Sequence, residues 1–398
     1  MKEENRRYAE EAFEIVEHAA KKIGSRLPGS DGEKEYAAYM GDKLRSIGIE
    51  PVREEFAVSP RASIGGIPYA GYLGLIMSAL VYVALHLSAV WYGMALASVV
   101  CWVWLILSVF LYKTWFDMFF KQEISQNTYG ELLPPDGKYD YTIILSGHTD
   151  TSWCWRHSAH ASKFKKTKPA MGLVATFAKV GFGVICFLFL TAVSIAMTVI
   201  SSGVYFGEVW ALKIANSASF ANFLFAMHFL PVVTAIGCMF VVMWADPNPR
   251  NASRGAMDNA TGCALSFAVT KYFHDHPEKM PKNCRIIDFN CGSEEAGLRG
   301  SIAFTREHKG EPILENTWNI NIDSVADKDF FEVVIKDDWQ FCRFDTDLEK
   351  MFKDTFNELG IVSKTNGCIH NPVGGCDSTP MTKAGMKSVT FAAQDPTL

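Results

Sequence analysis

Charge is what long parts of this sequence lack. No Asp, Glu, Lys or Arg occurs in residues 62–112, 180–207 or 214–245. Of all 398 residues, 20% are charged, 49% are hydrophobic and 13% are aromatic, whereas soluble domains carry about 25% charged residues. The rest of the chain has an ordinary charge content, so the composition is typical of a membrane protein with a soluble part.

The sequence also lacks an excess of positive charge. Its formal net charge is −5, so no basic surface is predicted and nucleic acid is excluded as a partner. The ten cysteines lack zinc-ribbon spacing, and three of them lie in the charge-free stretches. This distribution indicates free thiols in a reducing compartment. The first residues lack the apolar core of a secretory signal peptide.

The charge-free stretches are long enough for membrane-spanning helices, because about 20 apolar residues cross a hydrocarbon core of about 30 Å. A break near residues 86–93 divides the first stretch, and a short loop with Glu208 and Lys213 separates the other two. We predict four spans in two transmembrane hairpins, at 67–87, 92–112, 180–204 and 219–245. The alternative is a set of buried helices in a soluble fold.

Each hairpin returns the chain to the side of the membrane from which it came, so all soluble segments share one side. Positive residues are concentrated on that side, and the positive-inside tendency therefore predicts a cytoplasmic soluble part. Only Lys213 lies in the opposite loops, against Arg61, Lys113, Lys121, Lys163, Lys165, Lys166, Lys168, Lys179, Arg250 and Arg254.

The predicted domains follow from the spans. Hairpins at residues 62–121 and 171–245 leave a discontinuous soluble domain of residues 1–61, 122–170 and 246–398. Because the second hairpin separates His148 from Asp258, which are both candidate site residues, the mouth of the site is expected near the bilayer surface. Lysines 163, 165, 166 and 168 are expected either to contact anionic headgroups or to form a plain positive flank.

The soluble segments alternate between strand and helix patterns, which predicts an α/β protein with a largely parallel, covered sheet. Helical spacing of apolar residues occurs at 8–24, 33–48, 258–273 and 345–360. Strands are predicted at 51–58, 127–133, 141–147, 284–292, 317–324 and 330–336.

Acidic and imidazole side chains follow three of these strands, where open α/β sheets place their sites. His148 and Asp150 point to the same side of an extended segment, so the carboxylate can accept the second N–H of the imidazole. The other groups at the strand ends or before the helix at 258–273 are Asp258, Glu294, Glu295 and Asp323.

Each group also has an ordinary structural interpretation. His148 alone can be a core histidine, Asp258 can cap a helix, and Glu294 with Glu295 can form a solvated helix start. Together, however, they would leave buried negative charge without a partner unless a cation gathers them.

Several motifs resemble the co-catalytic zinc aminopeptidase family, which includes bacterial leucyl aminopeptidases, glutamate carboxypeptidase II and, more distantly, glutaminyl cyclase. They are RLPGSDGEKEYAAYMGDKLRSIGIE, SQNTYGELLPPDGKYDYTIILSGHTDT, GAMDNATGCA, CGSEEAGLRGS and NIDS. The resemblance covers nearly all of the soluble part and implies a three-layer, mostly parallel sheet of the zinc-exopeptidase type. The apolar hairpins do not belong to the family pattern.

The resemblance also implies roles for individual residues. Asp258 would bridge two zinc ions, His148 and Asp323 would complete one metal site, and Glu295 would bind the other ion. Glu294 would be the general base that activates water, and Asp150 would act beside it.

The sequence departs from the family pattern at the last ligand. A final histidine is expected beyond the segment GGCDSTPMTKAGMKSVTF, near Leu398. His370 is a weaker candidate because it precedes this segment, and Ser378 stands where many relatives carry a histidine. Two zinc ions are therefore expected, or one if the last ligand is missing.

The resulting hypothesis is a membrane-anchored zinc aminopeptidase with a peptide substrate and the lipid bilayer as its partners. One alternative is a zinc amidohydrolase or glutaminyl-cyclase-like enzyme that acts on a non-peptide amide. Another is a non-catalytic receptor or scaffold that retains the fold. Neither the side-chain preference nor the oligomeric state follows from the sequence.

Overall fold

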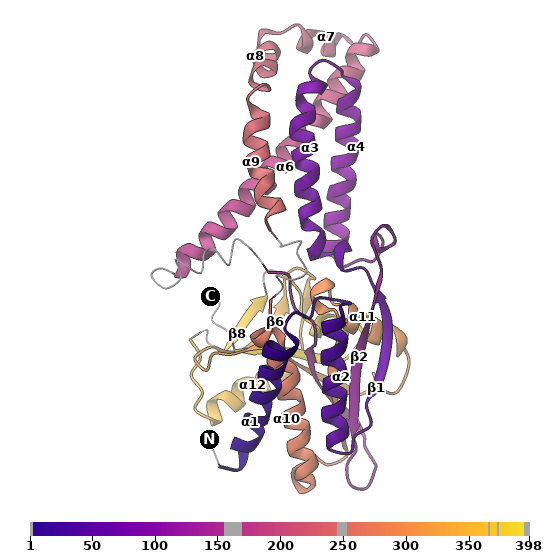
Figure 1. The fold of residues 1–398 in the computed structure, drawn as a ribbon, viewed down its shortest axis with the longest axis vertical. Helices are drawn as coiled ribbons and strands as arrows, with labels where there is room; N and C mark the ends of the chain where they lie inside the picture. Colours follow the sequence, from indigo (N-terminus) through magenta and orange to yellow (C-terminus); the bar gives the residue numbers. More distant parts are fainter. Residues whose placement is uncertain (1–2, 155–168, 245–252, 365–366, 372–373, 394–398) are drawn as a thin grey trace. The chain divides into compact units, whose positions relative to one another are not determined.

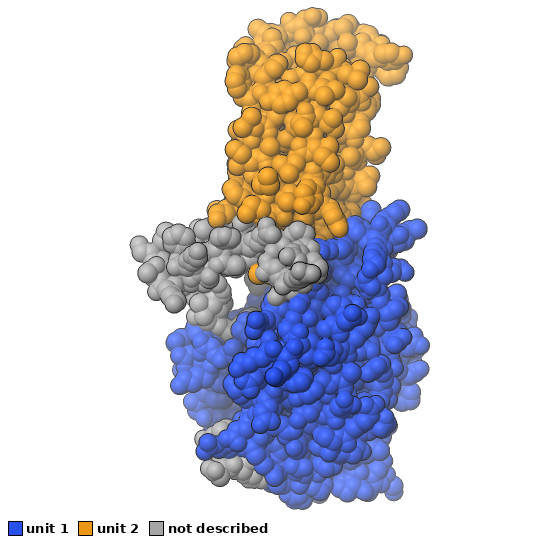
Figure 2. Space-filling model, in the orientation of Figure 1, with its two compact units in different colours: residues 1–64, 108–153, 248–396 blue, residues 65–107, 154–247, 397–398 orange. Residues whose placement is uncertain are grey.

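A computed structural model describes residues 3–154, 169–244, 253–364, 367–371 and 374–393. The chain forms two compact units, shown in blue and orange in Figure 2. The sheet unit comprises Met1–Ile64, Ser108–Trp153 and Asn248–Pro396, and the helical unit comprises Gly65–Leu107, Cys154–Pro247 and Thr397–Leu398. The predicted headgroup contacts of lysines 163, 165, 166 and 168, and the flanking Arg250, fall outside the described residues.

The sheet unit is built on one nine-stranded sheet with the order β1-β2-β4-β3-β5-β9-β6-β7, in which β8 also pairs with β6. Figure 1 labels strands β1, β2, β6 and β8 of this sheet. The first six strands confirm the predicted ones, and the last three were not predicted. The strands are β1 (Val52–Val58), β2 (Glu123–Leu132), β3 (Tyr141–His148), β4 (Cys284–Cys291), β5 (Thr317–Val325), β6 (Phe331–Asp337), β7 (Cys342–Arg343), β8 (Cys368–Asn371) and β9 (Lys387–Ala393).

The prediction of a mostly parallel sheet is wrong, because the sheet is mixed. Strands β4, β3, β5 and β9 are parallel neighbours. On the flanks, β1 pairs with β2, β2 with β4, and β6 with both β7 and β9 in antiparallel fashion. Antiparallel neighbours need no helical crossover, so the alternation of strands and helices described only the centre of the sheet.

Helices cover both faces of this sheet, as a three-layer architecture requires. Leu145 and Ile286 pack with Phe273 of α10 on one face, whereas Ile144 and Ile287 pack with Phe304 of α11 on the other. The first face also carries α1, α2 and α12, and the second carries α13. The bounds are α1 (Glu3–His18), α2 (Asp31–Ser46), α10 (Thr261–Asp275), α11 (Arg299–Glu307), α12 (Thr346–Glu358) and α13 (Ser378–Lys383).

One buried carboxyl group in the sheet predicts a pH effect on stability. Asp288 of β4 accepts hydrogen bonds from Ser266 Oγ and Asn290 Nδ2, both at 2.9 Å. Burial raises the pKa of Asp288 from 3.8 to about 7. Because the folded-state pKa is the higher one, the neutral acid stabilises the fold at low pH, and this contribution is lost as pH rises from about 4 through about 7.

The Asp288→Asn variant has no ionisable group at this position. Between about pH 5 and about pH 8 the free energy of unfolding of the original protein is therefore expected to fall relative to that of the variant. The fall is on the order of a few kcal/mol. Urea unfolding in detergent at both pH values measures it, and a pH-independent difference would contradict the assignment of a neutral Asp288.

Among its described residues, the helical unit contains three helices that are long and apolar enough to cross a membrane, or up to four if a bent pair forms one span. The predicted helix at 219–245 is not continuous, because α8 and α9 meet at 48°. Pro231 stands at the start of α9 and cannot donate the backbone hydrogen bond that would continue α8. The bounds are α3 (Ile67–Ala84), α4 (Ala89–Trp104), α6 (Pro169–Tyr205), α7 (Val209–Ala215), α8 (Ala218–Ala226) and α9 (Leu230–Val242).

Glycines allow the helices of this unit to pack closely. A Cβ atom at Gly74 would lie 2.4 Å from Cys238 Sγ, and one at Gly237 would lie 2.4 Å from Cys186 Sγ. Close contacts through small residues and outward-facing apolar side chains are typical of helices in lipid. The exposed side chains include Ile76, Leu96, Val100, Ile185 and Val232. Membrane crossing and a cytoplasmic sheet unit remain predictions.

Candidate metal centre

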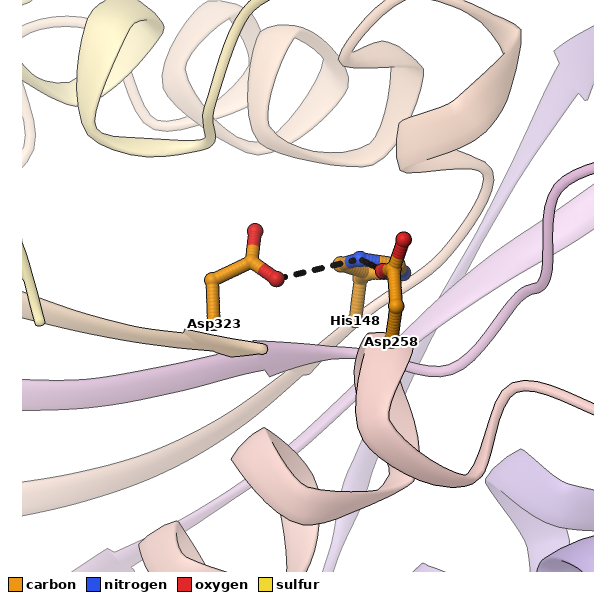
Figure 3. Close-up of side chains that lie close together, drawn as sticks. All are labelled: His148, Asp258 and Asp323. Atoms are coloured by element: carbon orange, nitrogen blue, oxygen red, sulfur yellow. Dashed lines mark ion pairs between the residues drawn. The ribbon is translucent and has the colours of Figure 1, made fainter. Parts of the chain in front are cut away.

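Three of the predicted ligands come together at one edge of the sheet (Figure 3). His148 ends β3, Asp323 lies on β5, and Asp258 lies in a short turn before α10. Their ligand atoms all lie within 4.8 Å of one another. His148 Nε2 is 3.0 Å from Asp258 Oδ1 and 3.9 Å from Asp323 Oδ1. One imidazole nitrogen and two carboxylate oxygens form a donor set that suits Zn²⁺.

The parallel register of the sheet explains why these residues meet. Strand β3 lies between β4 and β5, with His148 opposite Cys291 and Ser146 opposite Asn321. The carboxyl ends of the three strands therefore reach the same edge. Gly147 allows α10 to approach this edge closely, because a Cβ atom there would lie 2.5 Å from the backbone nitrogen of Cys263.

Asp150 connects the imidazole with the turn that follows β4. Its side chain is fully buried, and its Oδ1 lies 3.3 Å from His148 Nδ1. The same carboxylate accepts backbone hydrogen bonds from Glu294 at 2.9 Å and from Glu295 at 3.0 Å. It thereby orients the His148 ring, whose Nε2 faces the other carboxylates, and fixes the position of both glutamates.

The two glutamates begin a 3-10 turn, Glu294–Ala296, which follows Ser293 in a left-handed conformation with φ 53°. Glu294 Oε2 lies 4.0 Å from His148 Nε2. Glu295 is not a member of the three-ligand group that the described residues contain. A left-handed backbone conformation at a residue other than glycine destabilises the fold by on the order of 1 kcal/mol, and such residues often lie at functional sites.

Burial dominates the electrostatics of these acids. It raises the pKa of Glu294 well above its ordinary value, and the charge of Glu295 adds to this effect while His148 opposes it. Burial and the charge of Asp258 raise the pKa of Glu295, and burial raises the pKa of Asp323 to about 7. Several carboxyl groups that resist ionisation in one place form a site that a bound cation would stabilise.

The contacts of these residues differ from those of a helix cap, a solvated helix start or a core histidine. Asp258 does not cap α10, since the cap residue is Ala260 and the first turn is bonded by Asn259, whose Oδ1 accepts from the Gly262 backbone N–H at 2.9 Å. The Glu294 side chain is 11% exposed and is therefore not solvated. His148 faces carboxylates at both ring nitrogens.

The weaker candidates contact residues other than the three grouped ligands. His370 is on the short strand β8, is half exposed, and lies 3.4 Å from Asp338. Ser378 begins α13, and its hydroxyl is within 2.9 Å of Thr390 Oγ1. Residues 371–398 contain no histidine, so the final ligand expected near Leu398 is not present in this sequence.

Three buried charged residues around the site were not singled out from the sequence. Glu33 accepts from Ser293 N and Ser293 Oγ at 2.6 and 2.9 Å, which holds the start of the turn Glu294–Ala296. Asp377 accepts from Ser301 Oγ at 2.6 Å. Arg26 is fully buried, and its guanidinium group donates to the backbone carbonyl oxygens of Ala19, Gly24, Thr149, Arg254 and Gly255. A charged residue beside a Pro-Gly turn, as in RLPGSDGE, is a local signal for Arg26 and Glu33, although a weak one.

The sheet is covered on both faces, and its central parallel strands bring an imidazole and a carboxylate to one edge, beside Glu294. This α/β fold is similar to that of zinc exopeptidases. Residues 239–397 match the sequence model of Peptidase family M28. The match confirms the resemblance to co-catalytic zinc aminopeptidases and supports a zinc metallopeptidase. A comparison with curated protein sequences gave no match.

Several solved structures are similar to this one. BSAP, a zinc aminopeptidase from Bacillus subtilis, aligns with a TM-score of 0.50 and 13% identity over 98% of this chain and 86% of its own. A Zn-dependent exopeptidase from Parabacteroides distasonis has a TM-score of 0.47 and 12% identity, covering 98% and 85%. A glutaminyl cyclase from Bacteroides thetaiotaomicron has a TM-score of 0.47 and 12% identity, over 98% of this chain and 85% of its own. At these identities the likeness to BSAP shows the fold alone.

Proposed function

We propose that this protein is a membrane-anchored, zinc-dependent aminopeptidase that removes N-terminal residues from peptides. The observation that carries the proposal is the group of His148, Asp258 and Asp323, with ligand atoms within 4.8 Å of one another, beside Glu294 at 4.0 Å from His148 Nε2. The match to Peptidase family M28 supports peptide hydrolysis as the reaction. The apolar helices of the helical unit support the anchor.

The three grouped residues would hold one zinc ion, and Asp258 with Glu295 would hold a second. Bound zinc supplies Lewis-acid chemistry, because it polarises a carbonyl group and lowers the pKa of water toward neutrality. The chain contributes the orientation of the ligands. Asp150 fixes the His148 ring from the Nδ1 side and leaves Nε2 directed at Asp258 and Asp323.

Glu294 is the proposed general base. Its backbone N–H is bonded to Asp150, so the turn is held in place while the side chain extends to the Nε2 side of His148. From there the carboxylate can accept a proton from the attacking water and pass it to the leaving amine, as general acid–base catalysis requires. Glu295 is held by the same carboxylate through its own N–H and is free to serve as a ligand.

One observation favours a second candidate. The described residues contain a single group of three potential ligands within 4.8 Å, and such a site would suffice for an enzyme with one zinc ion. A glutaminyl-cyclase-like enzyme or an amidohydrolase that acts on a non-peptide amide would fit it.

Metal content and activity together test the proposal. We expect the full-length protein in detergent to contain two zinc ions per chain and to hydrolyse fluorogenic aminoacyl amides. A chelator should remove the ions and lower the rate by at least about 100-fold, and added zinc should restore it. One zinc ion with cyclisation of N-terminal glutamine would favour the second candidate. A protein without zinc or activity would be a scaffold and would contradict both.

A further inference from the structure

An exposed aromatic loop follows the first pair of apolar helices. We call residues 113–121, with the sequence KTWFDMFFK, the aromatic loop. Trp115 is 68% exposed, Met118 76% and Phe119 72%. The loop begins three residues after the candidate span Ala89–Phe110. Three large apolar side chains that project from one short loop form a surface that is unfavourable in water and that commonly marks an interaction site.

The composition of the aromatic loop matches a membrane interface. Aromatic residues gather where a protein passes from hydrocarbon to water, because their rings suit the headgroup level of the bilayer. Exposed Lys113 and Lys121 stand at the two ends of the loop, and cationic side chains at this depth attract anionic headgroups. Lys121 also lies 2.5 Å from Glu123, so Lys113 contributes more of the positive charge.

The base of the loop is fixed to the sheet unit. Asp117 Oδ1 accepts from Arg299 Nη2 at 3.2 Å, and the Asp117 carbonyl accepts from Ser59 Oγ at 3.0 Å. Arg299 is buried, with 4% of its surface exposed, and its Nη1 donates to the Tyr112 carbonyl at 3.1 Å. With its base held in this way, the loop projects Trp115, Met118 and Phe119 outward.

The same contacts connect the loop with the turn Glu294–Ala296, which carries the proposed base and which we call the catalytic turn. Arg299 begins α11, directly after the turn that contains Glu294 and Glu295. The Tyr112 ring packs against that turn, since a Cβ atom at Gly297 would lie 3.1 Å from Tyr112 Cδ1. Arg299 and Tyr112 therefore connect the aromatic loop with the turn that carries the proposed base.

A further exposed aromatic residue, Phe341, lies near this segment. Gln340 Nε2 donates to the Phe110 carbonyl at 2.5 Å, and the rings of Trp339 and Phe110 meet edge to face with 4.8 Å between their centroids. The next residue, Phe341, is 83% exposed. The turn between β6 and β7 thus adds an apolar side chain beside the end of the candidate span.

We propose that the aromatic loop is a lipid-binding element that inserts Trp115, Met118 and Phe119 at the headgroup level of the bilayer and so docks the catalytic turn onto the membrane surface. The partner is a bilayer that contains anionic lipid, because the apolar tip is bordered by lysines. The proposal rests on the membrane anchor proposed above and adds a second contact, made by the sheet unit itself. Substrates held at the membrane surface would then lie next to the active site.

Site-specific photocrosslinking in the full-length protein tests this contact. A benzophenone amino acid replaces Phe119 in one variant, and the protein is reconstituted in vesicles of phosphatidylcholine and phosphatidylserine. Two matched positions serve as controls: Leu96 of α4 and Phe13 of α1, each 68% exposed. We expect lipid adducts at positions 119 and 96 and none at position 13, as read by mass spectrometry after illumination.

The controls separate failure of this inference from failure of the anchor. Lipid adducts at position 96 without any at 119 would overturn the lipid contact of the loop and leave the anchor intact. A lack of lipid adducts at both positions would overturn the anchor as well. Adducts between two protein chains at position 119 would show that a second copy covers the loop, and equal lipid labelling at position 13 would remove the special role of the loop.

Discussion

Replacing Glu294 with Gln is expected to lower kcat by about 10²–10⁴-fold, which is the usual contribution of a positioned general base, while zinc content and the unfolding temperature stay close to those of the original protein. The amide has the shape of the carboxylate but cannot accept the proton. Because Asp150 holds residue 294 through the backbone N–H, the substitution leaves the turn in place. Hydrolysis of an aminoacyl amide at saturating substrate, with zinc measured on the same sample, gives both quantities.

Glu295→Gln is the matched control, since residue 295 is held by the same carboxylate through its own N–H. If Glu295 is a ligand and Glu294 is the base, Glu295→Gln lowers zinc content and activity together, whereas Glu294→Gln lowers activity alone. Undiminished turnover by Glu294→Gln would refute the proposed base. Loss of zinc in Glu294→Gln would instead identify Glu294 as a ligand.

Strands β3 and β4 at the centre of the sheet were predictable because each contains consecutive buried apolar residues, Ile144–Leu145 and Ile286–Ile287. Strand β4 is buried along its whole length, and such runs stand out in a sequence. The antiparallel flanks were not predictable, because strand direction depends on distant partners. Strand β9, for example, pairs in parallel with β5 and antiparallel with β6, and no local pattern in residues 387–393 specifies either neighbour.

The site shows the same division. His148, Asp258 and Asp323 could be identified because each follows or precedes a regular element, and parallel strands bring their carboxyl ends to one edge. The contacts that hold the site could not be identified in this way. The hydrogen bond from Ser293 to Glu33 joins residues 260 positions apart, and its existence depends on the completed fold. The break at Pro231 is different, since proline in an apolar helix is a visible local signal.

Arg26 is the clearest case of support that only the fold reveals. Its Nε donates to the Thr149 carbonyl at 2.7 Å, directly after His148. Its Nη1 and Nη2 donate to the carbonyls of Arg254 and Gly255 at 2.9 and 2.8 Å, directly before the turn of Asp258. The guanidinium group therefore joins the two segments that carry these two ligands, and it lies 4.8 Å from the centre of the Tyr36 ring.

Arg26→Lys is expected to weaken zinc binding by about 10–100-fold, the usual effect of removing a group that orients metal ligands. A lysine ammonium carries three donors at one point and cannot reproduce the planar fork that reaches both segments. The carbonyls of Thr149 or of Gly255 would then be left without a buried partner, and the distance between His148 and Asp258 would no longer be fixed. Competition with a chelating indicator measures the zinc Kd.

Arg285→Lys provides the control that separates positioning from general stability. Arg285 is also buried, and it bonds Thr142 Oγ1 and Glu131 at the opposite end of the central strands. Both substitutions should lower the unfolding temperature of the zinc-free protein, but only Arg26→Lys should raise the Kd for zinc. If Arg26→Lys binds zinc as tightly as the original protein, or if Arg285→Lys weakens binding equally, Arg26 serves only the stability of the fold. A selective loss of zinc affinity would instead make Arg26 the residue that sets the spacing between the two ligand segments.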